Sequence, residues 1–105
     1  MTHYRIVLTT AGSAEEAERL ATALVEAELA ACVNIVSQIA SVYRWKGSVQ
    51  KEQEWLLLIK TTASAFENVS RKIRELHSYD LPECIQIPIE AGSAEYLNWI
   101  AENVK

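Results

Sequence analysis

Residues 9–16 read Thr-Thr-Ala-Gly-Ser-Ala-Glu-Glu, and a shortened copy, Thr-Thr-Ala-Ser-Ala-Phe-Glu, returns at residues 61–67. Each copy follows an apolar run typical of a β-strand and precedes a pattern typical of an α-helix. In both copies a serine stands three residues before a glutamate: Ser13 before Glu16, and Ser64 before Glu67. This is the spacing of a capping box, in which two side chains bind free backbone N–H groups at a helix start. Two strand–cap–helix units in one short chain predict a duplicated βαβ fold.

Hydrophobic periodicity extends these units along the chain. Apolar runs predict strands at residues 4–10 and 85–89, and helical spacing of apolar residues predicts helices at 14–28, 64–76 and 94–104. Pro88 cannot donate to a neighbouring strand, so the strand at 85–89 is expected at a sheet edge or at a bulge. In the first helix we expect Glu16 to lie away from the apolar face.

Two segments between these units, residues 32–45 and 49–62, are rich in Val, Ile, Tyr, Trp and Leu, as strands are. Each is more than twice the roughly five or six residues of a typical strand. Residues 45–48, Trp-Lys-Gly-Ser, are expected to form the turn between them, and broken alternation predicts a bulge near residues 37–41. The exposed apolar edge of so long a hairpin invites aggregation unless another chain covers it. We therefore predict that subunits pair through this hairpin.

The element order is βαββαβ followed by a terminal helix. It predicts a single α+β domain over residues 1–105, a ferredoxin-like sandwich with strand order 4-1-3-2. Cys32 and Cys84 then lie at opposite sheet edges, three strand spacings or about 14 Å apart, beyond the reach of a disulfide.

Composition excludes several classes of function. The net charge is −4 and no basic run exceeds Arg71-Lys72, which argues against a nucleic-acid partner. No apolar stretch is long enough to span a bilayer, and residues 1–6 lack the pattern of a signal peptide, so we expect a cytoplasmic protein without a membrane partner. Half of the residues are apolar, which is at the upper end for a soluble domain and favours self-association.

Catalytic and metal-binding groups are few. The histidines are His3 and His77, and neither belongs to a recognisable catalytic triad. The loop at residues 9–13 has no arginine or lysine to bind an acyl phosphate, so we do not expect an enzyme. His77 with Cys32 or Cys84 offers soft ligands for copper or zinc. The alternatives are that His77 binds the last carbonyls of its helix and that Cys32 is a small buried hydrophobe.

A second candidate site is a cleft between subunits. His77, Tyr79, Asp80 and Glu83 form a polar loop, and Trp45 and Lys46 lie at the hairpin tip. A neighbouring hairpin crossing this loop would create a cleft with donors, acceptors and a stacking surface. The alternative is a solvated loop beside a tryptophan buried in an interface.

Several segments together resemble the CutA family of divalent-cation tolerance proteins. They are Ala30-Ala31-Cys32-Val33-Asn34, Tyr43-Arg44-Trp45-Lys46-Gly47, Glu54, Ile59-Lys60-Thr61-Thr62, His77-x-Tyr79-x-x-Pro82-Glu83, Pro88-Ile89 and Tyr96-Leu97-x-Trp99-Ile100. The resemblance implies a tight homotrimer whose long hairpins pair between subunits, with a PII-like architecture. It also implies a link to copper tolerance and, in some members, to copper binding.

This chain departs from the copper-binding members at two positions. It has Thr9 where such members can carry a cysteine, and Leu76-His77 where they can carry two histidines. We therefore expect a non-enzymatic homotrimer that holds copper or another divalent metal weakly, with His77 the main candidate ligand and Cys32 a weaker one.

The alternative is a PII-like sensor that binds a small anion or metabolite in the intersubunit cleft. The residues expected to form that cleft are Trp45, Lys46, Lys60, Tyr79 and Glu83. A third hypothesis is that the protein is a structural scaffold that binds no ligand of its own.

Overall fold

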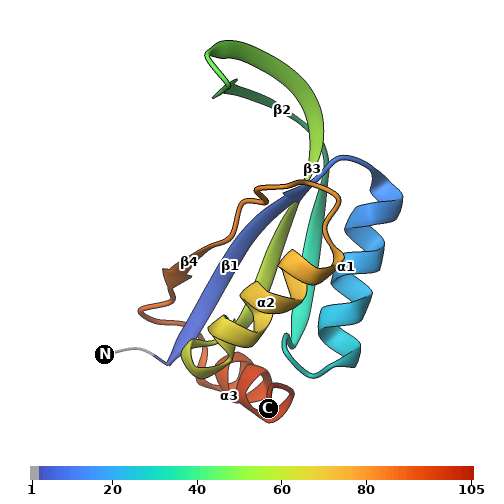
Figure 1. The fold of residues 1–105 in the computed structure, drawn as a ribbon. Coiled ribbons are helices and arrows are strands. Elements are labelled where there is room, and N and C mark those ends of the chain that lie inside the picture. The colour runs from blue at the N-terminus through green and yellow to red at the C-terminus, as the bar shows by residue number, and fades with distance from the viewer. Residues whose placement is uncertain (1–2) are drawn as a thin grey trace.

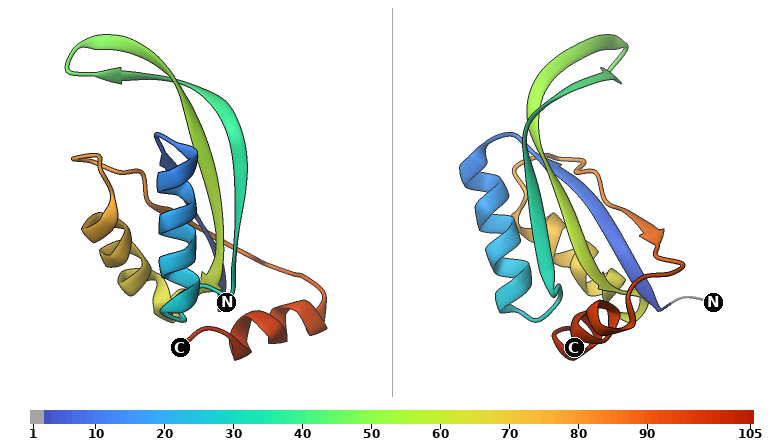
Figure 2. Two further views of the ribbon diagram at one scale, coloured as in Figure 1. Left: turned by 90° about the vertical axis from the view of Figure 1, so that its right-hand side faces the viewer. Right: turned by 180° about the vertical axis from the view of Figure 1, so that it is seen from behind.

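The computed structural model describes residues 3–105 and has the α+β architecture that the sequence predicts. Its elements are β1 (Tyr4–Ala11), α1 (Ala14–Glu26), β2 (Cys32–Trp45), β3 (Ser48–Thr62), the 3₁₀ turn η1 (Ala63–Ala65), α2 (Phe66–Leu76), β4 (Ile85–Pro88) and α3 (Ala94–Glu102). The strands form one antiparallel sheet in the order β2-β3-β1-β4, which is the predicted order read from the other edge. Both α1 and α2 lie on the same side of this sheet (Figures 1 and 2).

The core lies between these two helices and the sheet. Alternate strand residues such as Val7 and Leu57 point toward the helices, while residues at helical spacing on α1 and α2 point back. The largest fully buried apolar side chains of this cluster are Val7, Leu20, Leu24, Leu57, Ile59, Val69 and Ile73.

The first helix begins with half of the predicted capping box. Ser13 has an extended backbone, and its Oγ accepts the Glu16 N–H at 3.1 Å. The Glu16 carboxylate does not return to Ser13; its Oε1 accepts the Gly12 N–H instead, at 3.3 Å. We expected Glu16 to lie away from the apolar face of the helix, but it is not on the solvated side either, because the residue is only 5% exposed.

The second helix begins differently from the prediction. No side chain caps α2, and Ser64 Oγ lies 3.3 Å from Thr62 Oγ1 rather than on the Glu67 amide. A 3₁₀ turn precedes the helix, and its last bond runs from the Phe66 N–H to the Ala63 carbonyl. The tighter turn satisfies the Phe66 N–H, one of the backbone donors at the start of a helix, without a side-chain cap.

The long hairpin has the predicted turn and bulge. Lys46 and Gly47 have φ of 51° and 84°, the left-handed pair that suits the twist of a two-residue hairpin turn. The register of β2 on β3 shifts between Val36 and Ile39, where Gln38 has φ of 57°. Beyond this bulge the hairpin extends past the rest of the sheet and arches over (Figures 1 and 2).

The face of the sheet opposite α1 and α2 is also apolar. Ile6 pairs with Ile87 and Leu8 with Ile85, and each pair points away from the helices that cover Val7. Within one chain the aliphatic side chains on this face are partly or largely exposed: Ile6, Leu8, Val36, Leu56, Leu58, Ile85 and Ile87. We call these seven residues the open face.

The sheet edges agree with the sequence analysis. Pro88 lies opposite Arg5 on the edge strand β4. Cys32 opens the other edge strand, Cys84 precedes β4, and both thiols are free.

Candidate functional site

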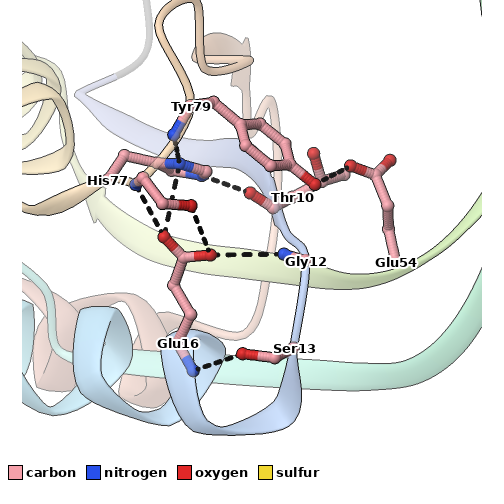
Figure 3. Close-up of polar contacts among 8 residues, drawn as sticks. Thr10, Gly12, Ser13, Glu16, Glu54, His77 and Tyr79 are labelled. Carbon is pink, nitrogen blue, oxygen red and sulfur yellow. Dashed lines mark hydrogen bonds and ion pairs between the residues drawn. The ribbon is translucent and has the colours of Figure 1, made fainter.

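A buried polar network lies where β1 ends, and His77 is at its centre (Figure 3). The His77 side chain is fully buried at the C-terminus of α2. Its Nε2 lies 2.6 Å from the Thr10 carbonyl oxygen, and its Nδ1 accepts the Tyr79 N–H at 3.1 Å. A carbonyl only accepts and an amide N–H only donates, so these contacts select the neutral tautomer with the proton on Nε2. Both ring nitrogens of His77 therefore have partners.

The Glu16 carboxylate is the second centre of this network. It accepts the Ser78 N–H at 2.8 Å, the Ser78 hydroxyl at 3.1 Å and the Gly12 N–H at 3.3 Å. Burial by itself raises the pKa of Glu16, but these three hydrogen-bond donors outweigh it and lower the pKa overall. The carboxylate thus stays ionised and ties the start of α1 to the loop after α2.

Tyr79 continues the network toward β3. Its hydroxyl donates to Glu54 Oε2 at 2.8 Å, and Glu54 is only 7% exposed. Burial and this bond to a carboxylate raise the pKa of Tyr79 above its usual range, so the phenol keeps its proton. Gly12 makes room for it, because a Cβ at Gly12 would lie 3.1 Å from the Tyr79 hydroxyl.

Tyr79 and Glu54 also form part of the wall of a hollow of about 880 Å³. The hollow lies between the distal part of the β2–β3 hairpin and the loop at residues 79–83. Trp45 and Glu83 line it as well, so three of the five residues predicted for the cleft meet in one chain.

The two predicted cleft lysines lie elsewhere in the chain. Lys46 is in the hairpin turn, with Nζ 5.8 Å from the centre of the Trp45 ring, and does not line the hollow. Lys60 pairs with Cys32 near the other end of the hairpin, and its Nζ donates to Asn34 Oδ1.

The predicted metal ligands do not meet within one chain. His77 bonds to Thr10, which pairs with Leu56, whereas Cys32 pairs with Lys60 four residues farther along β3. Among residues 3–105 no group of three or more His, Cys, Asp and Glu side chains is placed to hold a metal ion. A metal at either nitrogen of His77 would also have to replace a hydrogen bond. The donors of a single chain therefore do not fit a copper or zinc site, and His77 and Cys32 as ligands stay predictions.

Sequence reasoning missed Glu16 and Ser78 as parts of this site. The capping-box spacing marked Glu16, but nothing local shows that its carboxylate contacts a residue 62 positions away. The role of Gly12 in admitting the Tyr79 ring was also missed, because it depends on the tertiary fold.

In the described part of the chain, no helix is both long and apolar enough to cross a membrane.

Comparison with known proteins gives consistent matches. The family model described as "CutA1 divalent ion tolerance protein" matches residues 5–103. A protein of Thermus thermophilus named "Divalent-cation tolerance protein CutA" is 50% identical over 98 residues, which cover 93% of this chain and 95% of that protein.

A plant relative and a solved structure extend the match. "Protein CutA, chloroplastic" of Arabidopsis thaliana is 43% identical over 100 residues, 95% of this chain but 55% of the plant protein. This chain thus spans little more than half of that relative. The solved structure of the Thermus thermophilus protein has a TM-score of 0.95 at 48% identity and covers 97% of this chain and 99% of that chain.

Proposed function

The chain belongs to the CutA1 divalent ion tolerance family, and from this premise we propose that it serves divalent-cation tolerance as a non-enzymatic, cytoplasmic homotrimer. The role in tolerance is supported by the relatives that carry this name along nearly the whole chain.

The open face is the observation that carries the proposed assembly. Seven aliphatic side chains lie on a sheet face without α1 or α2 above it, and Ile85 and Ile87 are exposed. The distal hairpin adds Val42 and Val49, which are 65% and 64% exposed. Contiguous apolar surface of this kind is unusual in a monomer and typical of an interface. A long hairpin edge with free backbone groups likewise favours pairing with another chain. The family resemblance supplies the number of three subunits.

The metal is proposed to be copper or another divalent ion, held weakly. Imidazole and thiolate are ligand types that copper and zinc accept, which supports His77 first and Cys32 second. Weak binding follows from the network, because His77 must release either the Thr10 carbonyl or the Tyr79 amide to coordinate a metal.

Calorimetric titration of copper and zinc into the wild type, His77→Ala and Cys32→Ser tests this assignment. Cys84→Ser is the matched control, because it removes the other free thiol. We expect weak binding by the wild type, a clear loss in His77→Ala, a smaller loss in Cys32→Ser and no change in the control. Equal binding by the wild type and His77→Ala would eliminate His77 as a ligand.

The hollow favours a second candidate function, that of a PII-like sensor with a small ligand between subunits. Its volume lies within the range of known ligand sites. We expected an anion or metabolite there, but none of the described residues that line the hollow is a lysine or arginine. Within one chain the lining therefore suits a cation better than an anion. A thermal-shift screen of organic acids and nucleotides tests whether the protein binds an anion. If no compound of either class raises the melting temperature, that result would count against an anionic ligand.

A further inference from the structure

The distal part of the β2–β3 hairpin, residues 39–54, has little support from the rest of its own chain. Ala11 is the last residue of β1 and pairs with Trp55, so within residues 3–105 β1 does not extend beside β3 from Glu54 to the turn. Among residues 39–54, Glu54 is the only buried one and most of the others are exposed. A two-stranded ribbon alone is marginally stable in water. The angle at which this ribbon leaves the sheet (Figure 2) must therefore be set at its base.

The base of the ribbon is also the point at which its backbone bends. The register of β2 on β3 shifts within residues 36–39, and Ile39 pairs with Glu54 immediately beyond the shift. A bulge bends its strand and increases the local twist. The end of β1 and the bulge thus lie at the same level of the sheet. We call this level, residues 36–39 opposite Glu54 and Trp55, the hinge.

A side-chain hydrogen bond joins the body of the protein to the hinge. The Tyr79 hydroxyl donates to Glu54 Oε2 at 2.8 Å (Figure 3). Arg44 also donates a hydrogen bond, to the Gly47 carbonyl, but that bond stays inside the ribbon. Hydrogen bonds to an ionised acceptor are roughly twice as strong as those between neutral groups. Because Glu54 is only 7% exposed, water competes little for this acceptor.

The donor of this bond is itself held in place. The Glu16 carboxylate accepts both the Ser78 N–H and the Ser78 hydroxyl, which fixes the residue before Tyr79. The Tyr79 N–H donates to His77 Nδ1 at 3.1 Å, and the two rings lie 4.6 Å apart between centroids. The backbone and ring of Tyr79 are thus positioned by α1 and by the end of α2. Its hydroxyl therefore connects the helical layer to the hinge.

We propose that Tyr79 and Glu54 are positioning residues that fix the angle of the distal hairpin at its hinge. A hairpin held at one angle loses less conformational freedom when it pairs with another chain, so association costs less. The two residues favour assembly in this way without having to contact a sister chain. This consequence for assembly rests on the proposed trimer, whereas the effect on the hairpin is a property of the single chain.

Hydrogen exchange of the full chain, resolved by segment, tests the proposal. In Tyr79→Phe we expect the amides of residues 39–54 to exchange about tenfold faster, because a hydrogen bond to a charged group is lost at the hinge. The amides of β1 and of residues 57–60 should change less. Unchanged exchange in the hairpin would overturn the proposal. An equal change in all segments would also overturn it, because that result would show a general loss of stability.

Thr61→Val is the matched control. Thr61 also lies on β3, and its hydroxyl donates to the Leu29 carbonyl at 2.7 Å, away from the hinge. Its loss should lower the overall stability by a similar amount. We expect hydrogen exchange in the hairpin to rise no more than in β1. A selective rise in the hairpin of Thr61→Val, as large as that in Tyr79→Phe, would overturn the proposal.

Variants of the acceptor separate the hydrogen bond from the charge. Glu54→Gln keeps a side-chain oxygen that can accept from the Tyr79 hydroxyl, so it should retain most of the protection of the hairpin. Glu54→Leu removes the acceptor and should match Tyr79→Phe, and the double variant should be no worse than either single one. Equal effects of Glu54→Gln and Glu54→Leu, or additive effects in the double variant, would overturn the proposal.

Subunit exchange separates this inference from the proposed trimer. Native mass spectrometry of mixed isotope-labelled and unlabelled protein measures how fast chains redistribute between assemblies. We expect faster redistribution in Tyr79→Phe than in the wild type or Thr61→Val, and equal rates in all three would overturn the role in assembly. A monomeric wild type would contradict the trimer and leave the hydrogen-exchange result to decide on the hinge. A hairpin that exchanges alike in Tyr79→Phe and the wild type would overturn the hinge for either mass.

Discussion

Replacing Glu16 by alanine removes the carboxylate that joins the start of α1 to the loop at residues 77–79. Three donors lose their acceptor at once: the Ser78 amide, the Ser78 hydroxyl and the Gly12 amide. A hydrogen bond to a charged group contributes about 1.5–3 kcal/mol, and contributions within one network do not add fully. We therefore expect Glu16→Ala to lower the free energy of unfolding by about 3–5 kcal/mol, a large share of the stability of a small domain.

Glu15→Ala is the matched control. Glu15 is the preceding residue in the same first helical turn, but it is exposed. Its loss removes a favourable interaction with the helix dipole, worth about 0.3–1 kcal/mol. Glu16→Gln keeps the shape of the side chain and one acceptor, so it should fall between the two.

Denaturant unfolding monitored by circular dichroism measures these differences, at one protein concentration for all variants because assembly contributes to apparent stability. The diagnostic result is a loss for Glu16→Ala several times that for Glu15→Ala. Equal, small losses for both would refute the reasoning, since they would mean that the network around Glu16 does not stabilise the fold.

Further predictions concern the pH dependence of stability and the hydroxyl groups of Thr9, Thr61 and Tyr79. The folded pKa of Glu16 is lowered, so the native state binds fewer protons than the unfolded state in acid. The stability difference between the wild type and Glu16→Gln should be constant above about pH 5. This difference in stability should shrink as the pH falls through the folded pKa of Glu16. A difference that grows in acid would contradict the lowered pKa. Thr9 Oγ1 is buried without a hydrogen-bond partner among the described residues, whereas Thr61 Oγ1 donates to the Leu29 carbonyl at 2.7 Å. Thr9→Val should therefore raise the free energy of unfolding by about 1–2 kcal/mol and Thr61→Val lower it by a similar amount, and changes of the same sign would count against the assignment. Tyr79→Phe should cost about 1–3 kcal/mol at neutral pH, because it leaves Glu54 without its donor. Because the pKa of Tyr79 is raised in the folded protein, the wild type should keep its full stability advantage over Tyr79→Phe below the unfolded pKa of about 10. This difference in stability should fade as the pH rises further. Unfolding curves from pH 7 to 11 check this, and a penalty that is unchanged at pH 11 would be inconsistent with it.

Features set by neighbouring residues could be predicted from the sequence. The Ser13 cap, the Lys46-Gly47 turn and the bulge after Val36 each depend on a few adjacent residues, and each is present in the structure. The predicted start of the second helix failed although its residues resemble the first. One residue fewer in the second copy places Phe66 at the helix start after a 3₁₀ turn.

Features of the site that depend on distant residues could be predicted only in part. Trp45 and three loop residues, Tyr79, Asp80 and Glu83, were recognised as site residues, and they meet at the hollow. Lys60 was grouped with them in a cleft between subunits; within one chain it lies opposite Cys32, so its place in that cleft stays a prediction. The inward turn of Glu16 follows from donors on Ser78, which no local pattern reveals.

The oligomeric state tests the central claim, that the open face and the hairpin are covered by sister chains. Light scattering coupled to size-exclusion chromatography measures the mass in solution at micromolar concentration. We expect a mass three times that of the 11.8 kDa chain, and Ile87→Glu on the open face should reduce it. A wild-type mass equal to one chain would contradict the account directly.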